Sequence, residues 1–415
     1  MATRRGFTLG LAAFGLAGCI GGGGGGVGAT RAAVEPAMRA VPNPGWDAWV
    51  SGFRSRAEAR GISRATLDTA FRGAGFLPGV IERDRNQTEF TRTLEDYLAI
   101  ATSDERLSMG RAALARHRGL LSEIESRYGV APQVVTAFWG LESFYGTRRG
   151  DVPVISALST LAYDGRRGAF FEEQLTAALR ILQNGDTTAD RMTGSWAGAM
   201  GHTQFIPTSY LSLAVDFRGD GRRDIWGDDP TDALASTANY LNRSGWQRGQ
   251  PWGLEVRLPA GFAGPTGRGA QQGVAAWSRA GLRSADGGPL PDHGPGSVLV
   301  PQRGGPAFLV FRNFGVILRY NNAESYAIGI GHLSDRLAGG GPIRSTFPPD
   351  AAGLSRADRQ ELQRLLTRAG FDTEGADGVI GARTRAAIEG YERAQGLPVT
   401  GEPSQALLAR LRRPG

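Results

Sequence analysis

Residues 130–146, VAPQVVTAFWGLESFYG, place one carboxylate, Glu142, near the end of an otherwise apolar stretch. Pro132 suits the first turn of a helix, and Phe138 and Glu142 then share one helix face at i, i+4 spacing. Gly146 is expected to end this helix. Burial favours the protonated form of a carboxylate, and a carboxylic acid that stays protonated near neutral pH can act as a general acid. The stretch therefore predicts a buried acid, and a helix-end glutamate paired with an arginine of the following Arg-Arg pair fits it equally well.

The composition removes several other catalytic chemistries. The 415 residues contain no lysine, so all 47 cationic side chains are arginine, and neither a lysine Schiff base nor a P-loop lysine is available. Cys19 is the only cysteine, which leaves no disulfide, cysteine nucleophile or cysteine-ligated metal for a mature domain. The four histidines form no His-x-x-x-His pair and no Gly-x-Ser-x-Gly occurs, so a zinc peptidase and a serine hydrolase are disfavoured. We expect no cofactor and no resident metal.

The basic charge balance favours an anionic partner. The net charge is +7 and the pI is about 10. No arginine run is interleaved with aromatic residues, so we expect no nucleic-acid partner. An anionic cell-wall polymer or a membrane surface fits the charge as well.

The N-terminal residues have the features of an export signal. Arg4-Arg5 precede an apolar run too short to span a membrane, and the surrounding residues resemble a twin-arginine signal. Leu16-Ala17-Gly18-Cys19 resembles a lipobox, so we expect Cys19 to be lipidated; an incidental cysteine in an ordinary cleaved signal is the alternative. Residues 1–19 are assigned to the signal peptide with its lipobox, and residues 20–45 to a Gly-, Ala- and Pro-containing linker.

The rest of the chain divides into a long helical region and a C-terminal module. Residues 46–345 show mostly helical periodicity, interrupted near residues 252–320 by Gly, Pro and short β-prone runs. Residues 353–413 contain three helical patterns that follow a Pro-Pro boundary. We predict an α+β fold that is mostly α, with a small β-containing insert and a C-terminal three-helix module.

Five short motifs follow one another along the helical region. They are Gly-Leu-Glu-Ser-Phe-Tyr-Gly at 140–146, Gly-Ala-Met-Gly-His-Thr-Gln-Phe-Ile-Pro-Thr-Ser-Tyr at 198–210, Asp-Ile-Trp at 224–226, Ala-Asn-Tyr-Leu at 238–241 and Arg-Tyr-Asn-Asn at 319–322. Together they resemble the lytic murein transglycosylase B family over roughly residues 46–337. The C-terminal module carries Asp-Gly-Val-Ile-Gly at 377–381, Thr384, Ala387-Ile388, Tyr391, Gly396-Leu397 and Thr400-Gly401. These residues resemble the small peptidoglycan-binding domain.

The resemblance implies a lysozyme-like domain that cleaves the β-1,4 bond between N-acetylmuramic acid (MurNAc) and N-acetylglucosamine (GlcNAc) in peptidoglycan without hydrolysis. In this family the 6-hydroxyl of the muramic acid attacks its own C1 and leaves a 1,6-anhydro end. One glutamate serves as acid and then as base, and it matches Glu142. Ordinary glycosidases need two carboxylates, whereas an internal hydroxyl nucleophile, helped by the N-acetyl group, removes the need for the second.

The resemblance also assigns supporting residues, each with a structural alternative. Gln204 matches a cleft residue whose amide can contact an acetamido group, and a Gln that stabilises a turn is the alternative. Ser195 matches a cleft serine that hydrogen-bonds the carboxyl, and a helix cap is the alternative. Arg166-Arg167 suit substrate carboxylates, unless they belong to a solvated loop. The remaining matched residues, otherwise expected in the core, are Tyr97, Tyr240, Tyr320, Asn321 and Tyr326.

Two places depart from the family's pattern. Asp216, Asp220 and Gly221 fit positions 1, 5 and 6 of an EF-hand-like calcium loop that some relatives carry, but Arg218 occupies position 3, where an oxygen ligand belongs. We therefore do not expect bound calcium. His202 stands in the Gly-rich motif where relatives can carry an aromatic residue, and it is a candidate for stacking on a sugar rather than an acid or base.

Two other functions stay open from the residues alone. A lysozyme-like muramidase that uses water needs a second carboxylate, for which Asp151, Glu172 and Glu173 are available. A non-catalytic peptidoglycan-binding lipoprotein needs no acid at all, and the intact motifs around Glu142 and Gln204 disfavour it.

The export signal and the two resemblances together predict where the protein acts. We expect it in the periplasm, attached to a membrane through a lipidated Cys19, with the outer membrane favoured over the inner one. Its expected partners are peptidoglycan glycan strands, with cell-wall synthesis or division proteins as further candidates.

Overall fold

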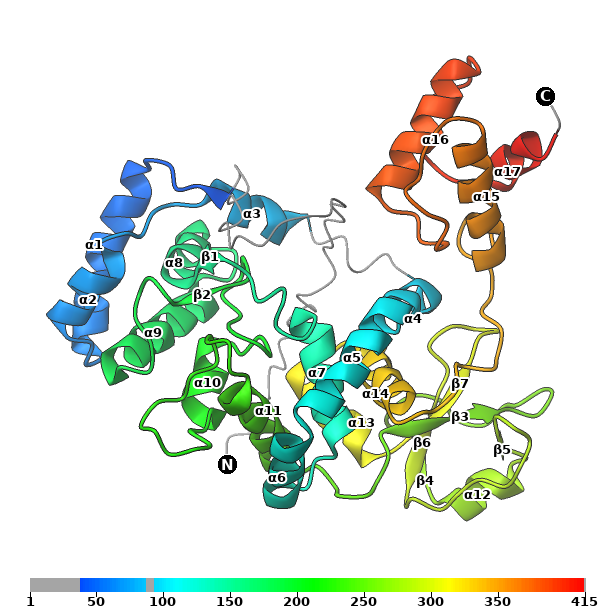
Figure 1. Ribbon diagram of the computed structural model, residues 1–415, viewed down its shortest axis with the longest axis horizontal. Coiled ribbons are helices and arrows are strands. Elements are labelled where there is room, and N and C mark those ends of the chain that lie inside the picture. Colours follow the sequence, from blue (N-terminus) through cyan, green and yellow to red (C-terminus); the bar gives the residue numbers. More distant parts are fainter. Residues whose placement is uncertain (1–37, 87–92, 414–415) are drawn as a thin grey trace. The chain divides into compact units, whose positions relative to one another are not determined.

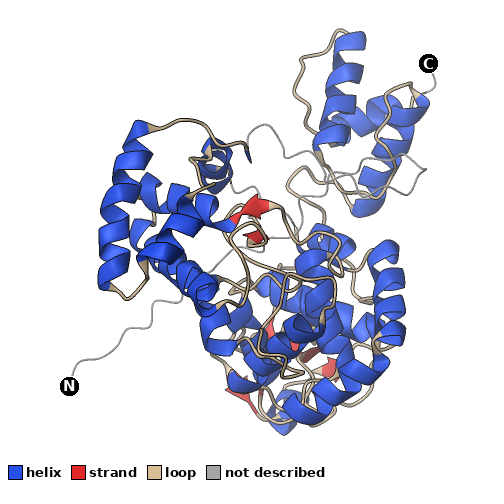
Figure 2. Cartoon of the chain, turned by 60° about the vertical axis from the view of Figure 1, so that its left-hand side comes forward, coloured by secondary structure: helices blue, strands red, loops and turns tan. Residues whose placement is uncertain are grey.

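The computed structural model describes residues 38–86 and 93–413. The predicted signal peptide, the lipobox with Cys19 and most of the predicted linker lie outside these residues. Helices predominate, and the strands are short (Figures 1 and 2). In the described part of the chain, no helix combines the length and the apolar character needed to cross a membrane. The mostly helical α+β fold predicted from the sequence is confirmed.

The chain forms two compact units, and the first is helical. It comprises the described residues within 1–90, 101–252 and 312–341. Its elements are α1 Pro44–Ala59, α2 Arg64–Phe71, α3 Pro78–Arg85, α5 Asp104–Arg116, α6 Arg118–Tyr128, α7 Pro132–Ser143, β1 Val152–Pro153, α8 Val154–Asp164, α9 Gly168–Asn184, β2 Thr193–Gly194, α10 Pro207–Leu213, α11 Thr231–Arg243, α13 Arg312–Tyr320 and α14 Glu324–Leu337. Helices α5, α6, α11 and α14 all pack against α7, which makes α7 the central element of this unit.

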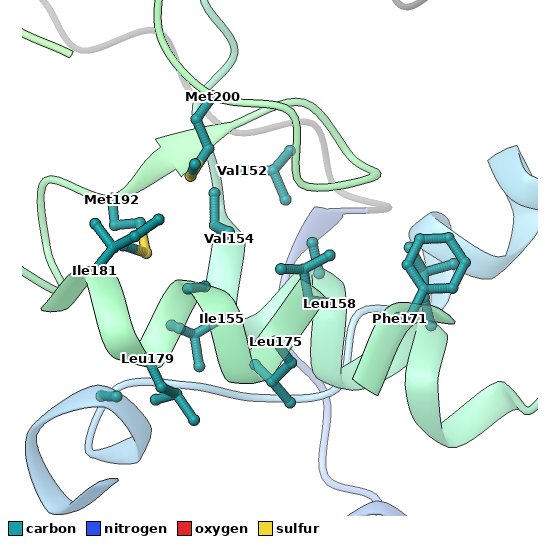
Figure 3. Packing of buried hydrophobic residues seen from close by; sticks show 14 of the residues in the cluster. Val152, Val154, Ile155, Leu158, Phe171, Leu175, Leu179, Ile181, Met192 and Met200 are labelled. Atoms are coloured by element: carbon teal, nitrogen blue, oxygen red, sulfur yellow. The ribbon is translucent and has the colours of Figure 1, made fainter. Parts of the chain in front are cut away.

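A hydrophobic cluster joins α8 to α9. Apolar residues recur every three or four positions along α9 and give the helix one apolar stripe. Ile155 and Leu158 of α8 and Phe171, Leu175 and Leu179 of α9 are buried in this cluster (Figure 3). Strand β1 leads directly into α8 and pairs with β2 in antiparallel fashion, so the cluster also anchors the Gly-rich segment that follows β2.

The second unit contains the predicted β-containing insert. It comprises the described residues within 91–100, 253–311 and 342–415. Its elements are α4 Leu94–Ala101, β3 Gly253–Arg257, β4 Gln271–Gln272, α12 Val274–Arg279, β5 Arg283–Ser284, β6 Gly296–Leu299, β7 Ala307–Val310, α15 Arg356–Arg368, α16 Ala382–Ala394 and α17 Gln405–Leu411. The strands form one antiparallel sheet in the order β4-β6-β7-β3-β5. Trp277 of α12 is buried in the core of this sheet and donates a hydrogen bond to the Gly296 carbonyl at 2.9 Å.

Helices α15, α16 and α17 form the three-helix module that the sequence predicts. Ser355 begins α15 with a capping box, because its hydroxyl accepts the Asp358 amide at 3.2 Å and the Asp358 carboxylate accepts the Ser355 amide at 3.0 Å. Leu362, Ile388 and Leu408, one from each helix, are fully buried in the small core between them.

Arg359 is a buried cation within the second unit. Its side chain is 1% exposed and lies 3.0 Å from Asp350, 2.6 Å from Asp96 and 3.2 Å from Glu95. Its Nε also donates to the Gly378 carbonyl at 2.7 Å. Glu95 and Asp96 belong to α4, so Arg359 joins α4 to α15. Burial raises the pKa of Glu95, although Arg359 opposes this effect.

Candidate active site

Helix α7 carries Glu142 and is buried on all sides. Pro132 occupies its first turn, as the sequence predicts, and every residue from Val134 to Ser143 is buried. Glu142 itself has 8% of its surface exposed. The prediction of a buried carboxylate at this position is confirmed.

The helix ends three residues before Gly146, so the predicted stop at that glycine is wrong. Phe144 and Tyr145 already adopt left-handed backbone conformations, with φ of 52° and 58°, and Gly146 follows at 84°. Such a conformation costs a non-glycine residue roughly 1–2 kcal/mol, and tertiary contacts offset this cost. The guanidinium groups of Arg106 and Arg148 lie 4.8 Å and 4.4 Å from the centre of the Phe144 ring.

Tyr145 locks the same turn from its other side. Its hydroxyl donates to the Arg106 carbonyl at 2.8 Å, and Arg106 in turn donates from Nε to the Gly140 carbonyl at 3.1 Å. The Tyr145 ring occupies the space next to Gly140, where an added Cβ would fall 2.6 Å from it. Burial raises the pKa of Tyr145, so its hydroxyl stays protonated. These contacts fix the backbone on which Glu142 sits.

Tyr326 of α14 donates a hydrogen bond to the Glu142 carboxyl. The tyrosine is 1% exposed, and its hydroxyl donates to Glu142 Oε1. Arg148 and Arg149, the predicted alternative partners, have other contacts: Arg148 covers the Phe144 ring and Arg149 donates to carbonyls of a neighbouring loop. The structure thus brings together two residues of the predicted site that are 184 positions apart in the sequence.

Tyr240 and Tyr320, also predicted site residues, belong to an aromatic cluster beside α7. Their ring centres lie 4.7 Å apart, and the Tyr320 ring lies 4.9 Å from that of Phe138 and 5.9 Å from that of Phe205. Both tyrosine hydroxyls donate to backbone carbonyls. Burial, together with the nearby Glu142 charge, raises the pKa of Tyr320. The cluster therefore presents neutral tyrosines with their hydroxyls fixed.

The Gly-rich segment after β2 folds back on itself, and Ser195 stabilises this turn. Met200 makes isolated bridges to both Gly194 and Phe205. The Ser195 hydroxyl accepts the Ala199 amide at 3.1 Å. This bond stabilises a turn, and no helix begins at Ser195, so the helix-cap alternative is wrong. The predicted bond from Ser195 to the Glu142 carboxyl stays a prediction.

Gln204 closes the turn with a left-handed backbone, at φ 54°. Its Nε2 donates to the carbonyls of Arg149 and Gly201, at 3.0 Å and 2.9 Å. Gly201 leaves no room for a side chain, since an added Cβ would lie 2.3 Å from the Ile225 carbonyl oxygen. Both amide hydrogens of Gln204 are therefore committed, and its Oε1 is the atom that remains to accept a hydrogen bond from a ligand.

His202 has contacts at this site that the sequence did not indicate. It is 3% exposed, so its predicted role in stacking on a sugar is not supported. Its ring nitrogens lie 3.1 Å from Trp139 Nε1 and 2.8 Å from the Gly227 carbonyl oxygen. Nothing in the local sequence indicated these partners, which are 63 and 25 residues away.

Arg166 and Arg167 both bind Asp84, which is 2% exposed. Arg166 Nε lies 2.7 Å and Arg167 Nη2 2.6 Å from the Asp84 carboxylate oxygens. Burial opposes ionisation of Asp84, but the two arginines outweigh it and lower the pKa of this carboxyl. The pair thus ties the start of α9 to the end of α3, and its contact with substrate carboxylates stays a prediction.

Three other residues named from the sequence, Asn321, Tyr97 and Glu172, each have contacts or surroundings of their own. Asn321 is buried, and its Oδ1 accepts the Ala323 amide at 3.2 Å just before α14. Tyr97 is buried on α4 in the second unit. The carboxylate of Glu172, a candidate second carboxylate, accepts hydrogen bonds from Arg56 Nε at 3.1 Å and Arg56 Nη2 at 2.8 Å. The hydrogen bonding to Arg56 is the main cause of the lowered pKa of Glu172.

The loop at Asp216 does not offer the ligands that a calcium ion needs. The Asp216 carboxylate accepts hydrogen bonds from the backbone amides of residues 219–221 at 2.6–3.1 Å. Arg218, at the position of an oxygen ligand, points its guanidinium to Glu123 at 2.5 Å. Within the part of the chain that the structure describes, no three His, Cys, Asp or Glu side chains gather as a metal site would require. The donor set at this loop therefore does not fit calcium.

The helical unit that carries the buried Glu142 and the three-helix module at the C-terminus each match a known protein family. The family model described as the transglycosylase SLT domain matches residues 45–335, and the putative peptidoglycan binding domain matches residues 355–411. The first match covers well over half of the chain, so the protein belongs to the SLT-domain transglycosylase family.

Several individual proteins are similar to this chain. SltB3 from Pseudomonas aeruginosa, in complex with NAG-anhNAM-pentapeptide, is 49% identical, with a TM-score of 0.72 over 89% of this chain and 100% of that one. The Escherichia coli lytic transglycosylase Slt35, in complex with calcium, is 27% identical, with a TM-score of 0.60 over 71% of this chain and 93% of that one. Membrane-bound lytic murein transglycosylase B from Escherichia coli (strain K12) is 33% identical over 219 residues. That alignment spans 51% of this chain and 58% of the length of that curated relative.

Proposed function

We propose that the protein is a lytic murein transglycosylase that cleaves the β-1,4 bond between MurNAc and GlcNAc and leaves 1,6-anhydroMurNAc ends. The observation that carries the proposal is the carboxyl of Glu142, buried at the strained end of α7 with the Tyr326 hydroxyl on its Oε1. Membership of the SLT-domain family and the anhydro sugar bound by the relative SltB3 support the same reaction.

In the proposed mechanism Glu142 acts first as an acid and then as a base. Because Tyr326 donates to Oε1, the proton to be transferred is carried by Oε2. Oε2 protonates the bridging oxygen, the GlcNAc side departs, and the carboxylate that forms keeps the Tyr326 hydrogen bond. Oε2 then takes the proton of the MurNAc 6-hydroxyl as that oxygen bonds to C1. The carboxyl is thereby restored and no water is consumed.

The substrate's acetamido groups are the expected ligands of Gln204. Because the two amide hydrogens of Gln204 are bonded to backbone carbonyls, its Oε1 is the atom that we propose accepts an acetamido N–H. We propose that the rings of Tyr240 and Tyr320 shape the substrate-binding surface next to Glu142, because they are fixed in one cluster with Phe138. Ser195, Asn321, Tyr97 and the Arg166-Arg167 pair stay candidate substrate-binding residues.

The proposal predicts that Glu142→Gln abolishes turnover of purified sacculi while the protein stays folded. Glutamine cannot donate and recover the proton, but it is nearly isosteric and still accepts the Tyr326 hydroxyl at its amide oxygen. Soluble products are measured by mass spectrometry, and folding by circular dichroism. Glu105→Gln on the exposed first turn of α5 is the matched control, which should keep full activity.

The mass of the products separates this proposal from a hydrolytic muramidase. An anhydro end is lighter than a reducing end by one water molecule. Reducing ends, together with activity lost in Asp151→Asn, Glu172→Gln or Glu173→Gln, would establish the hydrolytic alternative. Retained turnover in Glu142→Gln would exclude Glu142 as the acid. A wild type that binds sacculi but releases no products would support the non-catalytic lipoprotein.

We also propose that the C-terminal module holds peptidoglycan and that the protein acts in the periplasm, attached to a membrane through lipidated Cys19. The family match at residues 355–411 supports the first part, and the lipobox-like sequence supports the second. Cys19→Ser should release the protein from membrane fractions and prevent labelling by radioactive palmitate. Unchanged fractionation of that variant would refute the anchor. Cell-wall synthesis or division proteins are candidate partners at this location.

A further inference from the structure

His202 contacts α7 and the turn after it at three residues, which lie on either side of Glu142 in the sequence. Trp139 donates from Nε1 to the ring Nδ1 at 3.1 Å, and the Ser143 hydroxyl donates to the His202 carbonyl. Gly146 lies directly against the ring, since an added Cβ would fall 2.4 Å from Nδ1. His202 thus contacts residues both before and after Glu142 in the sequence.

The same histidine is held from the opposite side by a loop. Its backbone N–H donates to the Ile225 carbonyl at 3.1 Å, and its ring Nε2 lies 2.8 Å from the Gly227 carbonyl oxygen. Arg149 donates to the same Gly227 carbonyl and pairs with Asp228 at 3.1 Å. His202 therefore bridges α7 to a loop whose position is fixed independently.

The partners of the two ring nitrogens define one tautomer. An indole N–H can only donate, so Nδ1 must accept from Trp139 and carry no hydrogen. The ring hydrogen is then on Nε2, where it donates to the Gly227 carbonyl. Arg149 Nη1 lies 3.1 Å from Nε2, and because both groups are donors in this tautomer, the approach is not a hydrogen bond. A second ring proton would face the Trp139 N–H and add a cation beside Arg149.

We propose that His202, neutral and held in its Nε2–H tautomer, is a positioning residue that sets the direction of the Glu142 carboxyl by clamping Trp139, Ser143 and Gly146. The inference rests on the proposed function, because it assigns His202 a role in the reaction of Glu142. It also couples the acid to Gln204, since Gln204 donates to the carbonyl of Arg149, whose side chain holds the same loop.

The charged groups around His202 support a neutral ring. Burial is the main cause that lowers its pKa, and Arg149 lowers it further, whereas the bond to Gly227 and the carboxylates of Asp228 and Asp224 act in the opposite direction. His117 packs against the Trp139 ring at 5.4 Å, and burial lowers its pKa too. A folded-state pKa below the unfolded value means that stability is lost as the pH falls below about 6.5.

The experiment compares four variants by steady-state release of anhydro products from sacculi. His202→Phe keeps a ring but removes both nitrogens, and Trp139→Phe removes the opposing donor. Each should lower kcat about ten- to a hundredfold with KM within about twofold, because a shift of the acid affects the reaction more than binding. The double variant should be no worse than either single one. His202→Asn returns an acceptor near the Nδ1 position and should recover part of kcat.

Two further measurements keep the test decisive. His293→Phe, in the second unit, is the matched control and should retain activity. Nitrogen NMR of the folded wild type should show His202 as the neutral Nε2–H tautomer at pH 6.5, where an ordinary histidine is half protonated. This readout does not depend on activity, so it holds even where a variant fails to fold.

The outcomes are distinguishable from those that test the reaction itself. Wild-type kcat in folded His202→Phe, or a protonated or Nδ1–H ring in the wild type at pH 6.5, would overturn the positioning role. A wild type that forms no anhydro ends would instead overturn the proposed function, and the NMR measurement would still decide how His202 is bonded.

Discussion

Replacing Tyr326 with phenylalanine removes one hydroxyl group and keeps the ring in its cluster, where its centre lies 6.2 Å from that of Phe138. The lost hydroxyl donates to Glu142 Oε1 in a site where the tyrosine is 1% exposed, so water does not readily replace it. A hydrogen bond to a charged group is worth roughly 1.5–3 kcal/mol. Negative charge develops on Glu142 as it gives up its proton, so most of this loss falls on the transition state.

The expected result for Tyr326→Phe is a kcat lowered about ten- to a hundredfold, with KM little changed. Initial rates of anhydro-product release over a range of sacculus concentrations give both constants, and urea unfolding checks that the free energy of unfolding falls by no more than about 2 kcal/mol. Tyr163→Phe, a half-buried tyrosine on α8 next to Phe76, is the matched control. A kcat within about twofold of wild type, or a loss confined to KM, would refute the assigned role of the hydroxyl.

Two further predictions concern stability. Arg359→Met should lower the free energy of unfolding by roughly 3–5 kcal/mol, because three carboxylates within 3.2 Å lose their shared cation, and urea unfolding would contradict this if the midpoint did not move. Burial raises the pKa of Asp335 from 3.8 to about 6, even though the carboxylate accepts the Trp252 indole N–H at 2.9 Å. The folded state then binds this proton more tightly than the unfolded state, so the free energy of unfolding should fall as the pH rises from about 4 to 6, by up to about 3 kcal/mol. In Asp335→Asn this contribution to the pH slope should disappear, and an unchanged slope would show that other groups cause it.

Local patterns determined much of the fold. Pro132 and the apolar residues after it were sufficient to predict α7 and the burial of Glu142, because a helix start and an apolar helix depend on neighbours in sequence. The same holds for the three helices of the C-terminal module and for the small β-containing insert. The family motifs, each short and contiguous, were sufficient to indicate the class of enzyme and the residue that matches its acid.

Tertiary structure alone decided how the site is assembled. The helix ends at Ser143 instead of at Gly146, because buried contacts to Arg106 outweigh the backbone preference of the two aromatic residues that follow, Phe144 and Tyr145. Arg106 lies 39 residues from Tyr145, and no local pattern weighs such contacts.

The partners of the polar side chains were equally inaccessible from the sequence. A buried carboxylate or imidazole needs a hydrogen-bond partner. The sequence does not show which of the many candidate side chains will pack next to it. The sequence matched Tyr326 to the site without pairing it with Glu142, and it gave His202 a surface role although Trp139 holds the ring inside the protein. Residue types fixed the chemistry that is possible here, and the packing of helices far apart in the chain selected which groups meet.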